Sequence, residues 1–559
     1  MPTLVLVYFE VKSNYYFLDD KAYTEDDLLV YNVTAYQLHG KVTELELRKY
    51  FSQFGDVLKV YLQRDKYATG TAEPPIGVVH FAHPLAAARA LQRFSHELQK
   101  KRFFVNACES WEQPEAYRGA VDFNARIAAL NLNGDLIDFY TTMRTNILQL
   151  NDECLETICL YLPLRDQIRF SRVCRRFRDI FKHICKCTSK VFNMNQLIGM
   201  TLWDIREFFE MAGANIEELF GAVPYNYQDR IDFISELSPR VRRVDLNCNN
   251  VESASLLRFL ERFHAVTYVE LHNFSLNDKS LLALRKLPNL RALILDQSFE
   301  LTGKNLCKLY QLHELSLFGC ENLQTSHFID ICKCLFNLRS LDIRHCKMLT
   351  SRAYSEMVRN CRQLEQLKIS CEKEVNYDCV AQLHALRKLT VHSFGAVRET
   401  LFIALAAHKT QQLEKLEISA RNCITHERAI YLSRLQQLRS LICPNNDNLT
   451  DECLFEFAER LKYLEELDIK NCRTVTNIGV LVLLRRCPQL KLVNIEQCEG
   501  ITDDFVFDAC DVLKQGGRAY AQPVLFRVAG TSVHEIIVQG LPQLEVGHLL
   551  QFSFVEESS

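Results

Sequence analysis

The chain has 559 residues, which is too long for a single hydrophobic core and corresponds to about three or four domains unless a repeat array takes up the length. Its 66 basic and 69 acidic residues nearly cancel, so no overall basic field favours binding to nucleic acid or to an anionic membrane. The first residues, MPTLVLVYFEVK, lack the basic region and cleavage site of a secretory signal, and no stretch reaches the roughly 18 apolar residues of a membrane span. We therefore expect a soluble protein of the cytoplasm, the nucleus or both, with no membrane partner.

The 22 cysteines are spread along the chain without CxxC spacing, and the chain is far larger than the small secreted domains that disulfides hold together. We expect reduced thiols. The closest pairs, Cys185 with Cys187 and Cys332 with Cys334, lack the wider gap of about two to four residues that is typical of zinc sites. The sequence therefore predicts neither a metal site nor a cofactor.

Residues 1–27 are rich in tyrosine, end in the acidic TEDD and are expected to form an irregular N-terminal extension. The next segments alternate as strand, helix, strand, strand, helix, strand: LLVYNV, TELELRKYFSQFG, DVLKVYLQRD, IGVVHFA, PLAAARALQRF and KRFFVNAC. Thr43 is a suitable N-cap for the first helix, and Gly55 ends it. This order predicts a ferredoxin-like βαββαβ domain over residues 28–112, followed by a connector over residues 113–145.

This domain resembles an RNA recognition motif, which stacks bases on aromatic side chains of its two central strands. Alignment of the first motif places Leu29 at its stacking position, and Ile76 and Val78 occupy the aromatic positions of the second. Phe81 remains, at a position whose ring usually packs in the core. Because this sheet face is predicted to be aliphatic, we expect no RNA-stacking residues and favour a protein-docking or structural role. RNA binding stays open as the alternative.

The following segment predicts two short amphipathic helices. Asn151 caps the first, on which Leu155, Ile158 and Leu162 share a face before Pro163 ends the helix. A second helix is expected to begin near residue 166 and to carry separate apolar and basic stripes. Periodicity alone equally fits a helical hairpin buried against a neighbouring domain, and the basic stripe could alternatively bind nucleic acid or direct nuclear import. The apolar stripe consists of Phe170, Val173, Cys174, Phe177 and Phe181. The arginines expected to face solvent are Arg165, Arg169, Arg172 and Arg176.

The stretch LQLNDECLETICLYLPLRDQIRFSRVCRRFRDIF resembles an F-box, which we place at residues 146–190. It departs from the family pattern at Asn151, where proline is usual, and at Phe177, where tryptophan is common. The resemblance implies docking on the Skp-type adaptor of Skp-cullin-F-box ubiquitin ligases, and through it on a cullin-RING ligase. The residues that it implies for the adaptor interface are Leu150, Leu155, Ile158, Leu162, Leu164, Val173, Cys174 and Phe177.

A motif of the form L-x-x-L-x-L recurs through residues 191–514. Eleven clear copies begin between VRRVDL at 241 and LKLVNI at 490 with a mean period of 24.9 residues, and IEELFG at 216 is a weaker copy upstream. This period is typical of leucine-rich repeats, whose leucines fill a core that only stacked neighbours complete. The sequence predicts a curved α/β solenoid of about 11–12 repeats with a parallel concave sheet. Residues 515–559 lose the period and are expected to form a cap or tail, or to lie along the concave face.

Six repeats carry cysteine or asparagine three residues after the last apolar strand position, where a leucine-rich repeat turns the chain and satisfies buried backbone groups. We call this set the ladder and expect it to be structural. With CEGITD and RRCPQL, the array resembles the cysteine-containing repeats typical of F-box proteins. The ladder residues are Asn249, Cys320, Cys346, Asn446, Cys472 and Cys498.

Stacked strands lie about 4.8 Å apart, so eleven strands give an inner surface about 50 Å long, which suits a protein ligand. The outward strand residues mix both charges, and we expect some of them to contact a protein target. The candidates are Glu270, Phe318, Asp342, Arg344, Lys368, Asp468, Lys470, Asn494 and Glu496.

No P-loop, GxGxxG, GxSxG or HExxH motif is present, so we predict no catalytic residue and expect a non-catalytic protein. An F-box followed by repeats implies the substrate-recognition subunit of a Skp-cullin-F-box ligase, which would hold an unknown protein for ubiquitination and proteasomal degradation. The alternative hypothesis is an RNA-associated scaffold whose N-terminal domain binds RNA and whose repeats recruit proteins.

Overall fold

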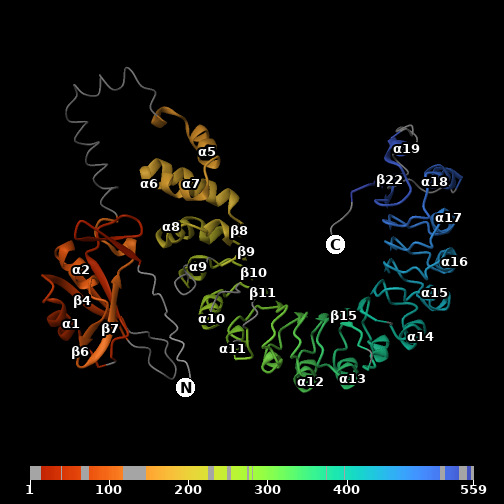
Figure 1. The fold of residues 1–559 in the computed structure, drawn as a ribbon, viewed down its shortest axis with the longest axis horizontal. Helices are drawn as coiled ribbons and strands as arrows, with labels where there is room; N and C mark the ends of the chain where they lie inside the picture. The colour runs from red at the N-terminus through yellow and green to blue at the C-terminus, as the bar shows by residue number, and fades with distance from the viewer. Residues whose placement is uncertain are drawn as a thin grey trace, which may run out of the picture. The chain divides into compact units, whose positions relative to one another are not determined.

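The computed structural model describes residues 14–39, 41–63, 75–116, 147–223, 232–247, 253–272, 276–279, 281–372, 374–395, 397–515, 523–539 and 550–555. The chain divides into two compact units, Met1–Ile216 and Glu217–Ser559 (Figure 1). Within the described ranges, no helix is both long enough and apolar enough to cross a membrane.

The first unit contains a β-hairpin where an irregular extension was predicted. β1 (Tyr15–Leu18) pairs antiparallel with β2 (Lys21–Thr24). Ala22 is fully buried in the core of the next domain, and the Oγ of Ser110 donates a hydrogen bond to the Oγ1 of Thr24 at 3.0 Å. The prediction was wrong for residues 14–27 because this short hairpin is completed by contacts from residues far along the chain.

A five-stranded antiparallel sheet follows, with strand order β4-β5-β3-β7-β6 and two helices, which confirms the predicted ferredoxin-like fold. Thr43 caps the first helix as expected, since its side chain accepts from the backbone N–H of Glu46 while Glu46 reaches back to Thr43. The elements are β3 (Asn32–Tyr36), α1 (Glu44–Phe51), β4 (Val57–Gln63), β5 (Ile76–Phe81), α2 (Pro84–Leu91), β6 (His96–Leu98), β7 (Lys101–Ala107) and η1 (Ser110–Glu112).

The F-box-like segment forms three helices rather than the two predicted. Cys174 adopts an extended conformation, with φ −158° and ψ 168°, and so divides the expected second helix. The break lets the rings of Phe170 and Phe177 stack with centroids 4.0 Å apart, whereas seven residues of continuous helix would separate them by about 10.5 Å. The elements are η2 (Ile147–Gln149), α5 (Asp152–Leu160), α6 (Leu164–Val173), α7 (Arg175–Thr188), β8 (Val191–Asn193), η3 (Met194–Leu197), α8 (Leu202–Ala212) and η4 (Gly213–Asn215).

The second unit is a leucine-rich-repeat solenoid, as predicted. Its strands pair in parallel and in sequence order, on the inner side of an arc whose outer side carries the helices (Figure 1). The strands are β9 (Glu218–Ala222), β10 (Arg243–Asn247), β11 (Tyr268–His272), β12 (Ala292–Ile294), β13 (Glu314–Ser316), β14 (Ser340–Ile343), β15 (Gln366–Ser370), β16 (Lys388–His392), β17 (Lys415–Ser419), β18 (Ser440–Ile442), β19 (Glu466–Asp468), β20 (Leu492–Asn494), β21 (Val524–Arg527) and β22 (Leu550–Ser553). The helices are α9 (Asp232–Leu237), α10 (Ser253–Glu261), α11 (Leu281–Leu284), η6 (Leu306–Lys308), α12 (Thr325–Cys334), α13 (Ser351–Asn360), η7 (Asp378–Gln382), α14 (Glu399–His408), α15 (His426–Ser433), α16 (Asp451–Arg460), α17 (Asn477–Arg486), α18 (Asp504–Gln515) and α19 (Glu535–Gln539).

The core of the solenoid is a row of aligned leucines. Leu367, Leu389 and Leu416 occupy equivalent positions of neighbouring strands and are at most 1% exposed. After the period is lost, the chain still adds to the sheet: β21 pairs with β20, and β22 pairs with β21. The described part of the C-terminal region therefore extends the concave sheet.

Candidate functional site

Helices α5 to α7 expose part of the apolar set assigned to an adaptor and bury the rest. Leu150 is 38% exposed, Ile158 37% and Val173 51%. Leu155 and Phe177 are only 0% and 3% exposed. These two side chains hold the helices together, so the expectation that they contact a partner is corrected.

The other three assigned residues, Leu162, Leu164 and Cys174, are half-buried. Leu162 and Leu164 line a cavity of about 530 Å³ between α6, α7 and the elements up to α8. Its apolar walls also include Phe181, Ile184, Val191, Phe192 and Phe208.

Among the described residues of this region, four exposed apolar residues were missed, and two of them, Ile147 and Leu148, lie on η2. Leu160 is 54% exposed and Tyr161 86% at the C-terminal end of α5. Tyr161 follows Ile158 by three residues, a helical spacing that could have identified it. We call the exposed set the apolar rim, and it consists of Leu150, Ile158, Leu160, Tyr161 and Val173.

The basic stripe is only partly the solvated row that was predicted, because two of its four arginines are held within the domain. The Nε of Arg172 lies 2.5 Å from Glu207 and its Nη2 lies 2.6 Å from Asp204, while its guanidinium covers the ring of Trp203 at 4.1 Å. Asp204 is 1% exposed and Glu207 8%, so these buried carboxylates require positive charge, and Arg172 is the nearest cation to both. This arginine fixes α6 to α8.

Arg176 is also occupied within the domain. It lies 2.7 Å from Asp152 and donates hydrogen bonds to the carbonyls of Leu148 and Leu150. These bonds place the start of α7 beside the segment that precedes α5. The side chains of Arg165 and Arg169 are 44% and 53% exposed and do face solvent.

The outer face of the N-terminal sheet is not aliphatic, which corrects the sequence-based expectation. On β3 and β7, alternate residues such as Val33 and Val105 enter the core, so their neighbours point to the other face. There the rings of Tyr36 and Phe104 stack with centroids 5.7 Å apart and an interplanar angle of 26°.

A second aromatic pair lies on β4 and β5 of this sheet. The rings of Tyr61 and His80 are 5.6 Å apart. Leu29 lies outside β3, Ile76 is 40% exposed and Val78 is 4% exposed. The motif alignment missed Tyr61 and Phe104 because they sit on the flanking strands β4 and β7. It missed Tyr36 and His80 because they lie on β3 and β5 at positions other than the aligned ones. Phe81, at 1% exposed, lies in the core as expected.

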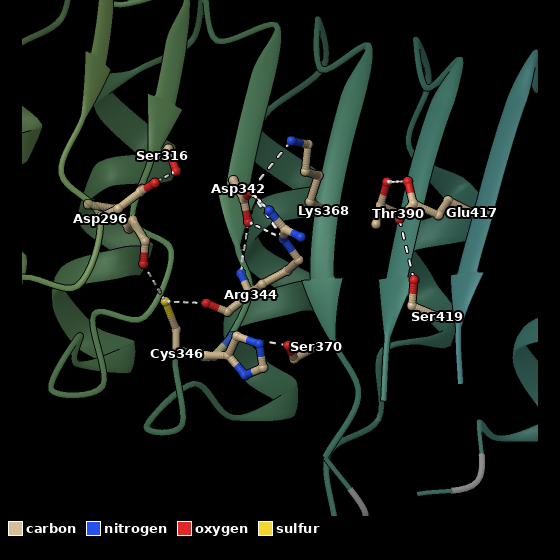
Figure 2. Close-up of polar contacts among 12 residues, drawn as sticks. Asp296, Ser316, Asp342, Arg344, Cys346, Lys368, Ser370, Thr390, Glu417 and Ser419 are labelled. Carbon is tan, nitrogen blue, oxygen red and sulfur yellow. Dashed lines mark hydrogen bonds and ion pairs between the residues drawn. The ribbon is translucent and has the colours of Figure 1, made fainter. Parts of the chain in front are cut away.

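At the centre of the concave face, three predicted residues form one cluster (Figure 2). Arg344 donates hydrogen bonds to both carboxylate oxygens of Asp342, at 3.0 Å from Nε and 2.7 Å from Nη2, and Lys368 points to the same carboxylate from 3.7 Å. The guanidinium of Arg344 also covers the ring of Phe318 at 4.9 Å. Two cations thus share one carboxylate.

The predicted residues near the end of the array are mostly paired with one another. Lys470 lies 2.7 Å from Glu496, and the amide of Asn494 donates to Asp468 at 3.0 Å. Glu496 is 1% exposed and Asn494 5%, which contradicts a direct contact role for these two. Burial raises the pKa of Asp468, and the bonds from Lys470 N–H and Asn494 oppose that shift.

Glu270 belongs to a mixed cluster on β10 and β11. The Nε2 of His272 lies 3.6 Å from Asp245 and 3.5 Å from Glu270, and Arg243 lies 3.9 Å and 3.7 Å from the same carboxylates. The hydroxyl of Tyr268 donates to Glu270 at 2.7 Å. In this cluster the single cation of Arg243 is shared by two carboxylates.

Two further carboxylates on the concave face were missed. The Oγ of Ser316 donates to Asp296 at 2.6 Å, while Glu417 accepts from Thr390 at 3.2 Å and from Ser419 at 3.4 Å (Figure 2). They flank the central cluster on either side in Figure 2. The alternation of each strand could have placed these residues on the surface, but not their hydroxyl partners.

An aromatic cluster lies where these strands end. Ring centroids of His345 and His392 are 4.9 Å apart, those of His392 and Phe394 are 4.9 Å apart, and Phe318 is 5.2 Å from His345. Phe394 is 91% exposed. Beside it is a cavity of about 610 Å³, lined by Lys347, Ser370, Cys371, Glu372, Glu374, Val375, His392, Ser393, Phe394 and Gly395.

The ladder has the structural role predicted for it. The Sγ of Cys320 donates to the carbonyl of Leu295 at 3.1 Å, and the equivalent distance from Cys498 to Ile469 is 3.3 Å. In the same position, the Oδ1 of Asn446 accepts from two backbone N–H groups of the preceding repeat. Asn249 lies outside the described residues.

Family comparisons confirm both domain resemblances. The F-box domain model matches residues 147–189, and the RNA recognition motif model matches residues 36–103. The chain therefore carries an F-box and an RNA-recognition-motif fold ahead of the leucine-rich repeats.

Among curated proteins, the chain is similar to the "Putative RNA-binding protein EEED8.10" of Caenorhabditis elegans, with 20% identity over 545 residues that cover 90% of this chain and 72% of that protein. It is also similar to "F-box protein SKIP1" of Arabidopsis thaliana, with 29% identity over 77 residues, 14% of this chain and 26% of the relative. Among solved structures, that of a Rad7 and Elc1 complex in yeast has 15% identity and a TM-score of 0.40, covering 68% of this chain and 94% of the other.

Proposed function

We propose that this chain, in which an F-box precedes a leucine-rich-repeat solenoid, is the substrate-recognition subunit of a Skp-cullin-F-box E3 ubiquitin ligase. The apolar rim is the observation that carries the proposal. Exposed apolar side chains on short helices cost solvation free energy unless a partner covers them, and a Skp-type adaptor is the partner that an F-box implies. In this function the chain acts in the cytoplasm, the nucleus or both.

The chain itself needs no catalytic residue for this function. The F-box holds the adaptor and, through it, the cullin-RING ligase, while the solenoid holds the protein target. Tethering converts transfer of ubiquitin to the target into a reaction at high effective concentration. The target is then ubiquitinated and degraded by the proteasome.

The test is co-purification of the full chain with a recombinant Skp-type adaptor. We expect the double variant Ile158→Asp, Val173→Asp to lose at least about tenfold of adaptor recovery, because it places two charges in an apolar interface. Phe336→Asp is the matched control, since Phe336 is 57% exposed on the solenoid. Equal recovery of adaptor by the double variant and the control would refute the proposal. Substitution of the buried Leu155 would not test it, because the helices would unfold.

The aromatic face of the N-terminal sheet supports a second candidate function, an RNA-associated scaffold whose repeats recruit proteins. Tyr36 and Phe104 offer rings on which bases can stack, at about 1–3 kcal/mol per base, and one relative is named as an RNA-binding protein. Fluorescence anisotropy with a labelled single-stranded RNA should show binding that Tyr36→Ala, Phe104→Ala weakens. Tyr16→Ala, in the exposed part of the hairpin, is the control. No binding by the unmodified chain would exclude this function.

A further inference from the structure

Asp296 and Glu417 are carboxylates held only by hydroxyl groups. Ser316 donates to Asp296, and Thr390 and Ser419 donate to Glu417. Among the residues that the structure describes, no basic side chain forms an ion pair with either carboxylate. The hydroxyls fix the orientation of each carboxylate, and the charge of Arg344 acts on both carboxylates only from beyond ion-pair distance.

The surroundings of Asp296 favour a closer cation. Burial raises the pKa of Asp296, the bond from Ser316 opposes the shift, and the charges of Asp342 and Glu270 raise it further. A cation that approached this carboxylate would relieve the cost of holding a negative charge on a half-buried surface.

The central cluster has the opposite sign. Arg344 and Lys368 share the single carboxylate of Asp342, which leaves one net positive charge between the two flanking carboxylates. The row of groups drawn in Figure 2, Asp296, then Arg344 and Lys368 with Asp342, then Glu417, is therefore negative, then positive, then negative from left to right. The outward residues Glu314, Lys388 and Lys415 lie in the neighbouring row, nearer the start of the strands.

The spacing of this pattern suits an extended peptide that runs across the strands. Neighbouring strands lie about 4.8 Å apart, so two strand spacings, or about 10 Å, separate each flanking carboxylate from the central cations. A peptide in the extended polyproline II conformation advances about 3.1 Å per residue with three residues per turn, so side chains three residues apart lie about 9 Å apart on the same face. The exposed ring of Phe394 adds an apolar contact at the end of these strands, beside a cavity whose lining is mostly polar.

We propose that the concave face from β12 to β17 binds an extended protein segment in which an acidic residue stands about three residues from a basic residue on each side. A large apolar side chain of the same segment packs against Phe394. This inference rests on the proposed function, because it specifies the class of target that the solenoid receives. The two carboxylates repel phosphate, so the charge pattern disfavours a nucleic acid at this site.

The first experiment selects phage-displayed random dodecapeptides on the full chain. We expect enriched peptides to share the basic–acidic–basic pattern with an aromatic or large aliphatic residue. Enrichment of peptides without this pattern, or binding of single-stranded RNA to this face instead of peptides, overturns the proposal.

The second experiment is a charge swap with the enriched consensus peptide, measured by fluorescence anisotropy. Glu417→Lys should weaken binding at least about tenfold, and a peptide whose facing basic residue is replaced by Glu should recover it on this variant alone. Glu452→Lys on the outer helix α16 is the control and should bind the original peptide normally. An unchanged affinity of Glu417→Lys, or no recovery with the swapped peptide, contradicts the assignment.

Peptide binding needs no adaptor, so the two proposals fail separately. Loss of adaptor binding with intact peptide selectivity removes the ligase function and leaves the site. Intact adaptor binding without peptide selectivity removes the site and leaves the ligase function.

Discussion

The sulfur of Cys498 shows how one side chain serves a neighbouring repeat. Its Sγ reaches the carbonyl of Ile469, and burial raises the pKa of this thiol from its ordinary value of 9.0 to about 12. Similar burial raises the pKa of Cys320 to about 12. Both thiols are protonated donors in the folded chain, which separates them from exposed cysteines such as Cys154 and Cys187.

This shift predicts a loss of stability at alkaline pH. The thiol of Cys498 ionises near pH 9 when unfolded and near pH 12 when folded, so its contribution is complete below pH 9 and is lost as pH rises from about 9 to about 12. The free energy of unfolding should fall between pH 8 and pH 10 in both proteins, and the fall should be about 1 kcal/mol smaller in Cys498→Asn than in the unmodified chain. Urea titrations at both pH values measure this difference. Cys154→Asn is the control, and an equal pH dependence in Cys498→Asn would contradict the role of burial.

The ladder could be predicted from sequence because its spacing after the last strand leucine is fixed. The pairing of Asp296 with Ser316 could not, since it depends on which side chains meet across two strands. The buried state of Glu496 was missed for the same reason: its charge suggested exposure, but Lys470 on the neighbouring repeat compensates it.

At the scale of elements, α6 and α7 show tertiary packing overriding a local pattern. No glycine or proline marks the break at Cys174, so periodicity predicts one helix. The stacked rings of Phe170 and Phe177 and the ion pairs of Arg172 with α8 are long-range or cross-helix contacts that periodicity does not contain. The same limit hid the hairpin of β1 and β2.

The ion pairs of Arg172 on α6 with Asp204 and Glu207 on α8 give a prediction about stability. Arg172→Met should lower the free energy of unfolding by about 3 kcal/mol, because it removes the nearest cation from the buried Asp204 and Glu207. Only the longer pairs with Arg165 at 3.8 Å and Arg178 at 3.7 Å would remain. Arg169→Met is the matched control on the same helix. Its exposed pair with Asp166 should be worth less than about 0.5 kcal/mol. Urea denaturation followed by circular dichroism measures the free energy of unfolding of both variants. Similar small losses in the two variants would show that the ion pairs of Arg172 are not needed for stability.

For the whole molecule, the repeat period predicted the parallel sheet and the outer helices. It could do so because each repeat buries its leucines against the neighbouring repeats in the same way. It did not predict that β21 and β22 prolong the sheet, since residues beyond 515 lose the leucine spacing. A strand at the end of such an array has one neighbour, whereas a central strand has two.

This difference predicts unequal effects of similar substitutions. Leu367→Ala in β15 should cost about 2–5 kcal/mol and lower the unfolding midpoint of the solenoid, because Leu367 is fully buried between two strands. Leu550→Ala in β22 should chiefly increase hydrogen exchange of β22 and leave protection of β15 unchanged. Hydrogen exchange measured by mass spectrometry distinguishes the two patterns. Loss of protection throughout the sheet in Leu550→Ala would contradict this account.

The ladder also constrains how such an array can change during evolution. Each ladder side chain in the described ranges bonds a backbone group of the repeat before it, as Cys320 does with the carbonyl of Leu295 and Asn446 does with the N–H of Cys423. An insertion or deletion that changed the distance between a strand and the ladder residue one repeat later would leave a buried polar group without its hydrogen-bond partner. Gene duplications of one complete repeat length avoid that penalty. They would also move the charged groups of the concave face apart in fixed steps, so a change of repeat number would be a change of ligand specificity.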